Sequence, residues 1–167
     1  ALAAIRRRAD LADHLGYRGP HVELRQACTG FANALMIAFG LLAHPDAAPV
    51  LIVGSETGSL FFDPARAEAD AGQLVNMIQM GDGAGAVVLA PSRPGHSRIS
   101  AAWFGAIGLH RPPGLQMLGG TREFDHDFGG IAASGHQLFE AGAAAALAAD
   151  APVARADIVI PHQVSGR

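Results

Sequence analysis

Apolar residues recur along the chain with two spacings, one typical of helices and one typical of buried strands. Over residues 1–15, 32–43 and 131–149 they return every three or four positions, which predicts three helices. Gly16 is placed to end the first helix, and the His-Pro-Asp sequence at 44–46 is placed to end the second. The third helix is very rich in alanine, so we expect it to pack closely against a sheet.

Short apolar or alternating runs outside these helices predict strands. The first of these runs is continuously apolar, which predicts a strand that is covered on both faces. The polar residues 55–59 follow it, at the end of a strand where open α/β sheets bind ligands. Residues 62–72 and 109–127 are predicted to be a surface excursion and a loop or lid. Helices that alternate with apolar strands indicate α/β layers rather than a bundle or a sandwich. The strands are expected at residues 49–54, 86–90, 98–108 and 157–160.

Residues 81–86, Gly-Asp-Gly-Ala-Gly-Ala, form a glycine-rich segment. A phosphate-binding Walker loop requires lysine, and the chain contains none. A dinucleotide-binding loop requires a strand before the glycines and a helix after them, whereas here the predicted strand follows. We therefore expect close backbone packing against a neighbouring loop, with Asp82 holding a turn.

Composition narrows the class of protein. Half of the 167 residues are hydrophobic and 16% are charged, which is typical of a folded domain with a core. The net charge of −3 argues against general binding to nucleic acid or to an anionic membrane surface. No apolar run reaches the roughly 20 residues of a membrane span, so neither nucleic acid nor membrane is an expected partner. A single cysteine suits a reducing compartment, and we expect a cytoplasmic protein.

Cys28 is that single cysteine, and it lies where an extended segment at 21–27 gives way to the second helix. The unpaired N–H groups and the dipole at a helix N-terminus favour the thiolate, which is the nucleophilic form. Gly30 removes a side chain near the sulfur and leaves room for a substrate carbonyl. A lone cysteine beside apolar residues is also commonly an inert small hydrophobe, and this stretch alone leaves that alternative open.

Histidines near carboxylates raise the possibility of a metal site. His110, His126 and His136 have Asp125 and Asp127 nearby in the sequence. Their spacing fits no template of metal ligands. We therefore expect no metal site and interpret these histidines as solvated or capping residues.

Three segments, taken in order and spacing, resemble the β-ketoacyl-acyl-carrier-protein synthase III family of the thiolase superfamily. They are Ala-Cys-Thr-Gly-Phe at 27–31, the glycine-rich segment with its strand at 81–89, and Ile-Pro-His-Gln-Val-Ser-Gly-Arg at 160–167. The interval from Cys28 to His162 is close to the family's cysteine-to-histidine spacing. Each motif is weak alone, but together they cover essentially the whole chain and favour a catalytic Cys28.

The resemblance implies an α/β, thiolase-like fold with αβαβα layers, which this chain would contain only in part. Residues 1–93 would be the latter part of the first half, with the nucleophilic cysteine, and residues 94–167 the start of the second half, with the catalytic histidine. We expect the chain to be an internal fragment of a longer protein, because family residues would lie before Ala1 and beyond Arg167. The resemblance also implies a homodimer.

The chemistry implied by the resemblance is a decarboxylative Claisen condensation. Cys28 would accept the acyl group of an acyl-CoA, and malonyl-acyl-carrier-protein would then attack that group as a carbanion. His162 would donate a hydrogen bond to the thioester oxygen of the second substrate, and the Cys28 N–H would form part of the oxyanion hole. Arg167 matches an arginine near the CoA or carrier-protein entrance. The implied partners are acyl-CoA and acyl carrier protein, with the CoA thioester as substrate and no cofactor.

The chain departs from the family pattern in two places. Val164 and Ser165 follow Pro-His-Gln where the family has alanine and asparagine, and Gln79 and Met80 stand where leucine and phenylalanine are common. The latter region helps to shape the acyl pocket in the family. We therefore expect an acyl preference that differs from that of the housekeeping enzyme, in fatty acid or polyketide biosynthesis.

Three alternatives remain open at this point. A protein of the same fold could pass the acyl group to a hydroxyl or an amine without decarboxylation. It could be a non-catalytic partner subunit, although such subunits usually lose the cysteine. A cysteine hydrolase with a Cys–His pair is the third alternative, and it leaves the glycine-rich segment unexplained.

Overall fold

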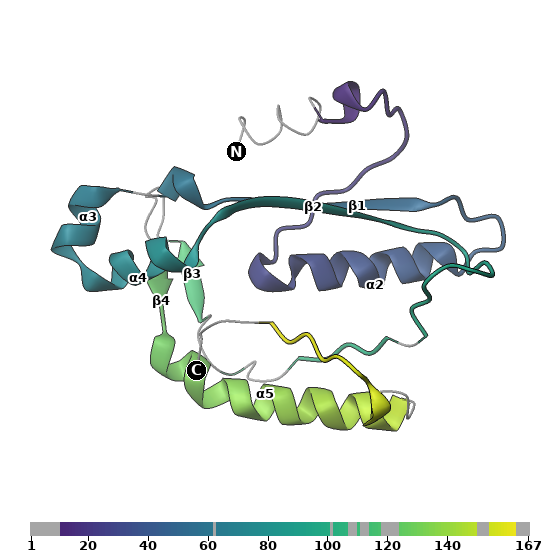
Figure 1. The fold of residues 1–167 in the computed structure, drawn as a ribbon. Helices are drawn as coiled ribbons and strands as arrows, with labels where there is room; N and C mark the ends of the chain where they lie inside the picture. The colour runs from purple at the N-terminus through teal and green to yellow at the C-terminus, as the bar shows by residue number, and fades with distance from the viewer. Residues whose placement is uncertain are drawn as a thin grey trace. The chain divides into compact units, whose positions relative to one another are not determined.

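The computed structural model describes residues 11–61, 63–100, 102–106, 110, 114–117, 124–149 and 154–162. The chain divides into two compact units, Ala1–Ala34 and Leu35–Arg167, and each unit is described by itself (Figure 1). Helices and strands both occur, which agrees with the predicted α/β class. The predicted domain boundary between residues 93 and 94 stays a prediction.

The first unit contains a helical turn at residues 11–14, which ends at Gly16 as predicted. Gly16 has a positive φ of 64°, a conformation that glycine adopts without steric cost. The N–H of Tyr17 donates to the carbonyl of Ala12 at 2.8 Å and closes the turn. The rest of this predicted helix, residues 1–10, lies outside the described residues. A segment without regular structure then leads to the short 3-10 helix η1 (Ala27–Thr29).

Helix α2 (Gly30–Leu42) follows η1 directly and runs from the first unit into the second. It confirms the helix predicted over residues 32–43. The helix closes where the N–H of Ala43 donates to the carbonyl of Phe39 at 3.1 Å. His44 and Asp46 continue as a turn, in which the Asp46 N–H donates to Nδ1 of His44 at 3.3 Å. The predicted helix stop at 44–46 is therefore confirmed.

Strands β1 (Val50–Thr57) and β2 (Asp82–Leu89) form an antiparallel pair in the second unit (Figure 1). Their register runs from Val50 opposite Leu89 to Thr57 opposite Asp82. β2 therefore begins inside the glycine-rich segment, which the sequence interpretation had placed before the strand, and that part of the prediction is wrong. Two glycines lie opposite each other in the pair, Gly54 and Gly85, and place no side chain on either strand there.

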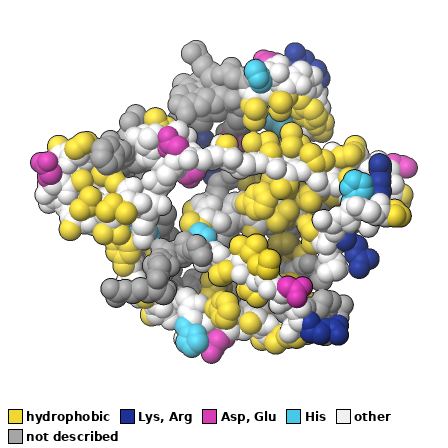
Figure 2. All heavy atoms as spheres, in the orientation of Figure 1, with side chains coloured by type: hydrophobic (Ala, Val, Ile, Leu, Met, Phe, Trp, Pro, Cys, Tyr) yellow, Lys and Arg dark blue, Asp and Glu magenta, His cyan; other side chains and the backbone are white. Residues whose placement is uncertain are grey.

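The prediction that residues 49–54 are covered on both faces is also wrong for the described structure. Within β1, Ile52 is buried with 7% exposure, whereas the neighbouring Leu51 is 50% exposed. Most residues of both strands are exposed, so little of the described chain covers the faces of this pair. Figure 2 shows many hydrophobic side chains at the surface. Exposed apolar surface of this kind is typical of regions that another chain or segment covers.

Three short helices connect β1 to β2: η2 (Gly58–Phe61), α3 (Pro64–Ala69) and α4 (Ala71–Gln79). The predicted surface excursion is therefore partly helical. The carboxylate of Asp63 accepts from the N–H of Ala65 at 3.1 Å and from that of Arg66 at 3.4 Å, and a proline follows the cap. An aspartate cap before proline is a local start signal for a helix, and the sequence interpretation did not use it.

The segment predicted as a loop or lid contains a second antiparallel pair, β3 (Leu115–Met117) and β4 (Phe124–His126). Part of that prediction is therefore wrong. A ring nitrogen of His126 lies 2.8 Å from Oδ1 of Asn76, which is buried in α4 with 4% exposure. This contact is made between residues 50 positions apart in sequence. The partner of His126 in β4 is thus a residue of α4, which only the tertiary structure reveals.

Helix α5 (Phe128–Ala149) confirms the alanine-rich helix predicted over 131–149 and begins three residues earlier. The carboxylate of Asp127 accepts from the Gly130 N–H at 2.8 Å at its start. The strands predicted at 98–108 and 157–160 are wrong for their described residues, which adopt no strand there. A strand needs a hydrogen-bonded neighbour, and apolar character alone does not supply one. None of the helices in the described ranges combines the length and apolar character that crossing a membrane requires.

Candidate active site

Cys28 lies in η1, immediately before α2, and its side chain is exposed. The cysteine therefore occupies the first turn of a continuous helical stretch. An exposed thiol in that position is accessible to a substrate in solution. The structure thus places Cys28 at a helix start, as predicted.

The residues around Cys28 hold this turn through their own hydrogen bonds. The hydroxyl of Thr29 donates to the Gln26 carbonyl at 2.8 Å, and the Thr29 N–H donates to the same oxygen at 3.1 Å. The side-chain amide of Asn33 donates to Oε1 of Gln26. The Gly30 N–H closes the turn by donating to the carbonyl of Ala27. Four bonds on both sides of Cys28 therefore restrain its backbone.

Ala27 is the residue that sequence reasoning missed. Its φ is 45°, and it is the one non-glycine residue with positive φ in the described part of the chain. A residue with a Cβ in this region typically costs about 1–3 kcal/mol, and such residues occur preferentially at functional sites. No sequence signal predicts it, because alanine usually avoids this conformation. The strained residue is the first of η1 and directly precedes Cys28.

His162 belongs to the second unit and lies at the end of the described segment 154–162. It is exposed, and it follows Pro161 in a stretch without regular structure. Cys28 and His162 thus fall in different units, each described by itself. Arg167, the predicted entrance residue, lies outside the described residues. Within the described part of the chain, no three His, Cys, Asp or Glu side chains gather as metal ligands would.

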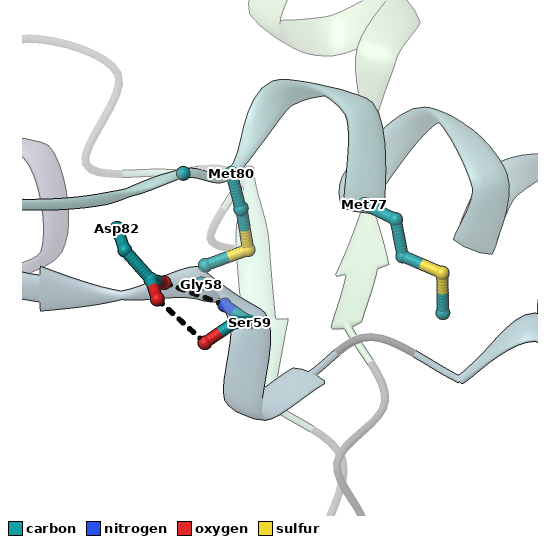
Figure 3. Close-up of a pocket in the computed structure, with 6 residues that line it drawn as sticks. Gly58, Ser59, Met77, Met80 and Asp82 are labelled. Carbon is teal, nitrogen blue, oxygen red and sulfur yellow. Dashed lines mark hydrogen bonds between the residues drawn. The ribbon is translucent and has the colours of Figure 1, made fainter.

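A pocket of about 310 Å³ lies within the second unit, between η2 and the start of β2 (Figure 3). Its lining combines an apolar part, from two methionines, with a polar part, from a hydroxyl and a carboxylate. The lining residues are Gly58, Ser59, Met77, Met80, Gly81 and Asp82. Met80 is the departure from the family pattern noted in the sequence.

Asp82 joins the two sides of this pocket. Its Oδ2 accepts from the Ser59 hydroxyl at 2.6 Å, and its Oδ1 accepts from the Ser59 N–H at 2.8 Å (Figure 3). These bonds, the hydroxyl bond first and the N–H bond second, hold the pKa of Asp82 below its ordinary value, because they stabilise the ionised carboxylate. The prediction that Asp82 holds a turn is therefore confirmed, with η2 as that turn.

Gly58 brings the backbones of η2 and β2 into contact. Its N–H donates to the Gly81 carbonyl at 3.2 Å. A Cβ on Gly58 would lie 2.8 Å from the carbonyl carbon of Met80 and 2.9 Å from the nitrogen of Gly81. The start of the glycine-rich segment therefore lies against a neighbouring loop, as predicted, but the glycine that permits this is Gly58 in that loop. A Cβ on Gly81, Gly83 or Gly85 would meet no atom within 4 Å, so the prediction that the segment's own glycines permit the close packing is wrong.

We predict that Gly58→Ala destabilises the protein. The added methyl would overlap backbone atoms of Met80 and Gly81, which cannot rotate away, so the free energy of unfolding should fall by about 1–3 kcal/mol. Gly85→Ala is the matched control, because a Cβ on Gly85 in β2 meets no atom within 4 Å. Urea unfolding followed by circular dichroism measures both. Equal effects of the two substitutions would contradict the proposed overlap.

Comparison with known proteins identifies the family. The model of the 3-oxoacyl-(acyl-carrier-protein) synthase III family matches residues 22–108, a span that contains Cys28 and the whole pocket. The chain therefore belongs to this family. Membership, together with the mixed helices and strands, confirms the predicted α/β, thiolase-like fold class.

Curated relatives agree over most of the chain. A beta-ketoacyl-(acyl-carrier-protein) synthase III from Deinococcus deserti is 32% identical over 158 residues, which are 87% of this chain and 42% of the relative. One from Rhodospirillum rubrum is 30% identical over 89% of this chain and 47% of its own length. One from Thiobacillus denitrificans is 39% identical over 55% of this chain and 26% of its own. The chain spans less than half the length of each of these relatives. No solved structure gives a significant match.

Proposed function

We propose that this chain carries the nucleophile of an acyl-thioester condensing enzyme, which loads an acyl group from acyl-CoA onto Cys28 and extends it with malonyl-acyl-carrier-protein. The observation that carries the proposal is the exposed Cys28 in the first helical turn after a strained Ala27. This arrangement lies within the part of the chain that matches the synthase family. An accessible thiol on a restrained turn is what nucleophilic catalysis needs.

The first half-reaction is acyl transfer. The Cys28 thiolate attacks the thioester carbonyl, the C–S bond to CoA breaks, and CoA leaves as a thiolate that takes up a proton. Negative charge develops on the carbonyl oxygen during this attack, and hydrogen-bond donors at that position lower the barrier. The N–H of Cys28 belongs to the first helical turn and is our candidate for one of these donors.

The second half-reaction is the condensation. The malonyl thioester loses CO2, and the electron pair of the broken C–C bond becomes an enolate that attacks the acyl carbonyl on Cys28. A new C–C bond forms, and the C–S bond to Cys28 breaks to restore the thiolate. We assign to His162 the hydrogen bond that stabilises the enolate oxygen, since a neutral imidazole N–H can donate one.

The proposal also includes an entrance residue, a subunit arrangement and a cellular location. A guanidinium pairs well with phosphate, so Arg167 suits the entrance used by CoA or by the carrier protein. Exposed apolar side chains such as Leu51 and Val88 on the β1–β2 pair support a homodimer or another covering chain. A free thiol nucleophile works in a reducing compartment, which supports a cytoplasmic location.

Release of CO2 tests the condensing function directly. The natural full-length protein is incubated with an acyl-CoA and carboxyl-labelled malonyl-acyl-carrier-protein, and labelled CO2 and the 3-oxoacyl product are measured together. We expect both in equal amounts. An acyl group that appears on a hydroxyl or amine acceptor without CO2 would replace this proposal with simple acyl transfer.

A further inference from the structure

Gln26 is the residue on which the hydrogen bonds of the Cys28 turn converge, and neither proposed half-reaction uses it. Its carbonyl oxygen accepts from the Thr29 N–H at 3.1 Å and from the Thr29 hydroxyl at 2.8 Å. Its side-chain Oε1 accepts from the side-chain amide of Asn33. We call the contact between these two side chains the Gln26–Asn33 bridge. Both of its residues belong to the first unit, as Cys28 does.

The bridge joins the residue before the Cys28 turn to a residue of the helix that follows the turn. Gln26 precedes η1 and is exposed, whereas Asn33 lies in α2 and is half-buried. In one continuous helix, residues seven positions apart are separated by roughly 10 Å along the axis, and the side chains that meet are three or four positions apart. The contact therefore depends on a break in the helical path between its two ends.

The chain makes this break at Gln26 and Ala27. Gln26 has a φ of −137° and a ψ of 39°, and Ala27 has a φ of 45°, so neither residue is helical. A non-glycine residue with positive φ costs free energy and persists only where its surroundings hold it in place. The bonds to Gln26 provide such surroundings, because they fix the residue directly before Ala27. Without the bridge, Ala27 would be freer to return to a negative φ, and that change would rotate the backbone of Cys28.

We propose that the Gln26–Asn33 bridge is a positioning device that holds Ala27 at positive φ, so that the sulfur and the N–H of Cys28 meet the thioester carbonyl together. Gln26 and Asn33 touch no reacting atom in this role and act through the backbone of the two residues between them and the sulfur. The inference rests on the proposed function, because it requires that Cys28 accepts an acyl group.

Two reagents separate the alignment of Cys28 from simple access to its thiol. Acyl transfer from an acyl-CoA needs the sulfur beside the carbonyl carbon and a donor at the developing oxyanion. Alkylation by iodoacetamide forms a C–S bond and releases iodide, and no oxyanion develops, so its rate depends on the exposure and the thiolate fraction of the cysteine. Loss of the bridge should therefore slow acylation and leave alkylation unchanged, whereas a disrupted turn would change both rates.

The test compares the natural full-length protein with its Gln26→Ala, Asn33→Ala and doubly substituted variants in single-turnover acylation by one acyl-CoA, followed by intact mass. Each single substitution removes the bridge and keeps the Gln26 carbonyl that Thr29 binds. We expect each to lower the maximal rate of acylation about tenfold at an unchanged half-saturating concentration of acyl-CoA, because a small misplacement of a reacting group is costly. The double variant should be no slower than either single variant, since all three lack the same bond.

Asp13→Ala is the matched control in the first unit. It removes another exposed hydrogen bond between two side chains, from Arg18 to Asp13 at 2.5 Å, beside the helical turn that ends at Gly16. Acylation and alkylation should both keep their parental rates in this variant. Circular dichroism identifies the folded variants, and Gln26→Ala, at an exposed position outside α2, serves if Asn33→Ala does not fold.

The outcomes that contradict the inference differ from those that contradict the proposed function. The positioning role is removed by unchanged acylation in the folded single variants, by an equal fall in alkylation, by an equal effect of Asp13→Ala, or by a double variant slowed by the product of the two single effects. The proposed function survives each of these results, because the parent protein still forms its adduct. Absence of any adduct on the parent removes the proposed function, and the inference falls with it.

Discussion

Replacing Cys28 by alanine is expected to abolish the acyl adduct and to lower condensation by at least about a thousandfold, because the thiolate is the group that forms the covalent intermediate. The loss should occur without unfolding. Cys28 is exposed, and exposed substitutions usually change the free energy of unfolding by no more than about 0.5 kcal/mol. Intact mass after incubation with a panel of acyl-CoA thioesters measures the adduct, and the acyl groups taken up define the substrate class.

Thr29→Ala serves as a control for the Cys28→Ala variant. It removes the hydroxyl bond to the Gln26 carbonyl and keeps the thiol, so some adduct should remain. An adduct on the Cys28→Ala protein of the same mass as on the parent would show that another side chain is acylated. That result would remove Cys28 from the mechanism and reinstate the alternative of a structural cysteine.

Replacing His162 by alanine is expected to separate the two half-reactions. The acyl adduct on Cys28 should form at close to the parental level, since the proposed role of His162 is in the decarboxylation of the second substrate. Condensation should fall by about a hundredfold to a thousandfold, the usual effect of losing one donor to a developing oxyanion. Single-turnover measurements of adduct formation and of labelled CO2 release, made on the same preparation, give the two effects separately.

His136→Ala is the matched control for His162→Ala. His136 is also exposed, and its Nε2 lies 3.5 Å from a carboxylate oxygen of Glu140 in the next turn of α5. Its loss should leave both half-reactions unchanged, because exposed pairs of this kind contribute little to stability. Equal losses of adduct formation and CO2 release in His162→Ala would contradict the assigned role and indicate a structural one.

The helices of this chain were largely predictable from short stretches of sequence. The helix that follows Cys28, the stop at Gly16 and the alanine-rich helix before His162 depend on residues within one or two turns of each other. Periodicity, breakers and caps act over such distances, so a linear pattern contains the information. The motifs that indicated the family could be recognised in the sequence for the same reason, because each of them is a contiguous stretch.

The strands at 98–108 and 157–160 show where this kind of prediction fails. Their apolar residues satisfy the pattern of a strand, yet the described residues form none. Residues 115–117 and 124–126, which were predicted as loop, pair with each other instead. A strand is defined by a partner, and no local pattern states which partner is available.

Sequence by itself therefore determined the family, the nucleophile candidate and the helix that presents it. Tertiary structure alone decided that β2 begins at Asp82, that Ser59 is its partner, that Gly58 is the point of close approach, and that Ala27 takes a positive φ before Cys28. The physical reason is distance along the chain. Helical periodicity and capping are local, whereas the β1–β2 pairing and the Ser59–Asp82 hydrogen bonds join residues more than 20 positions apart, and only the folded chain brings them together.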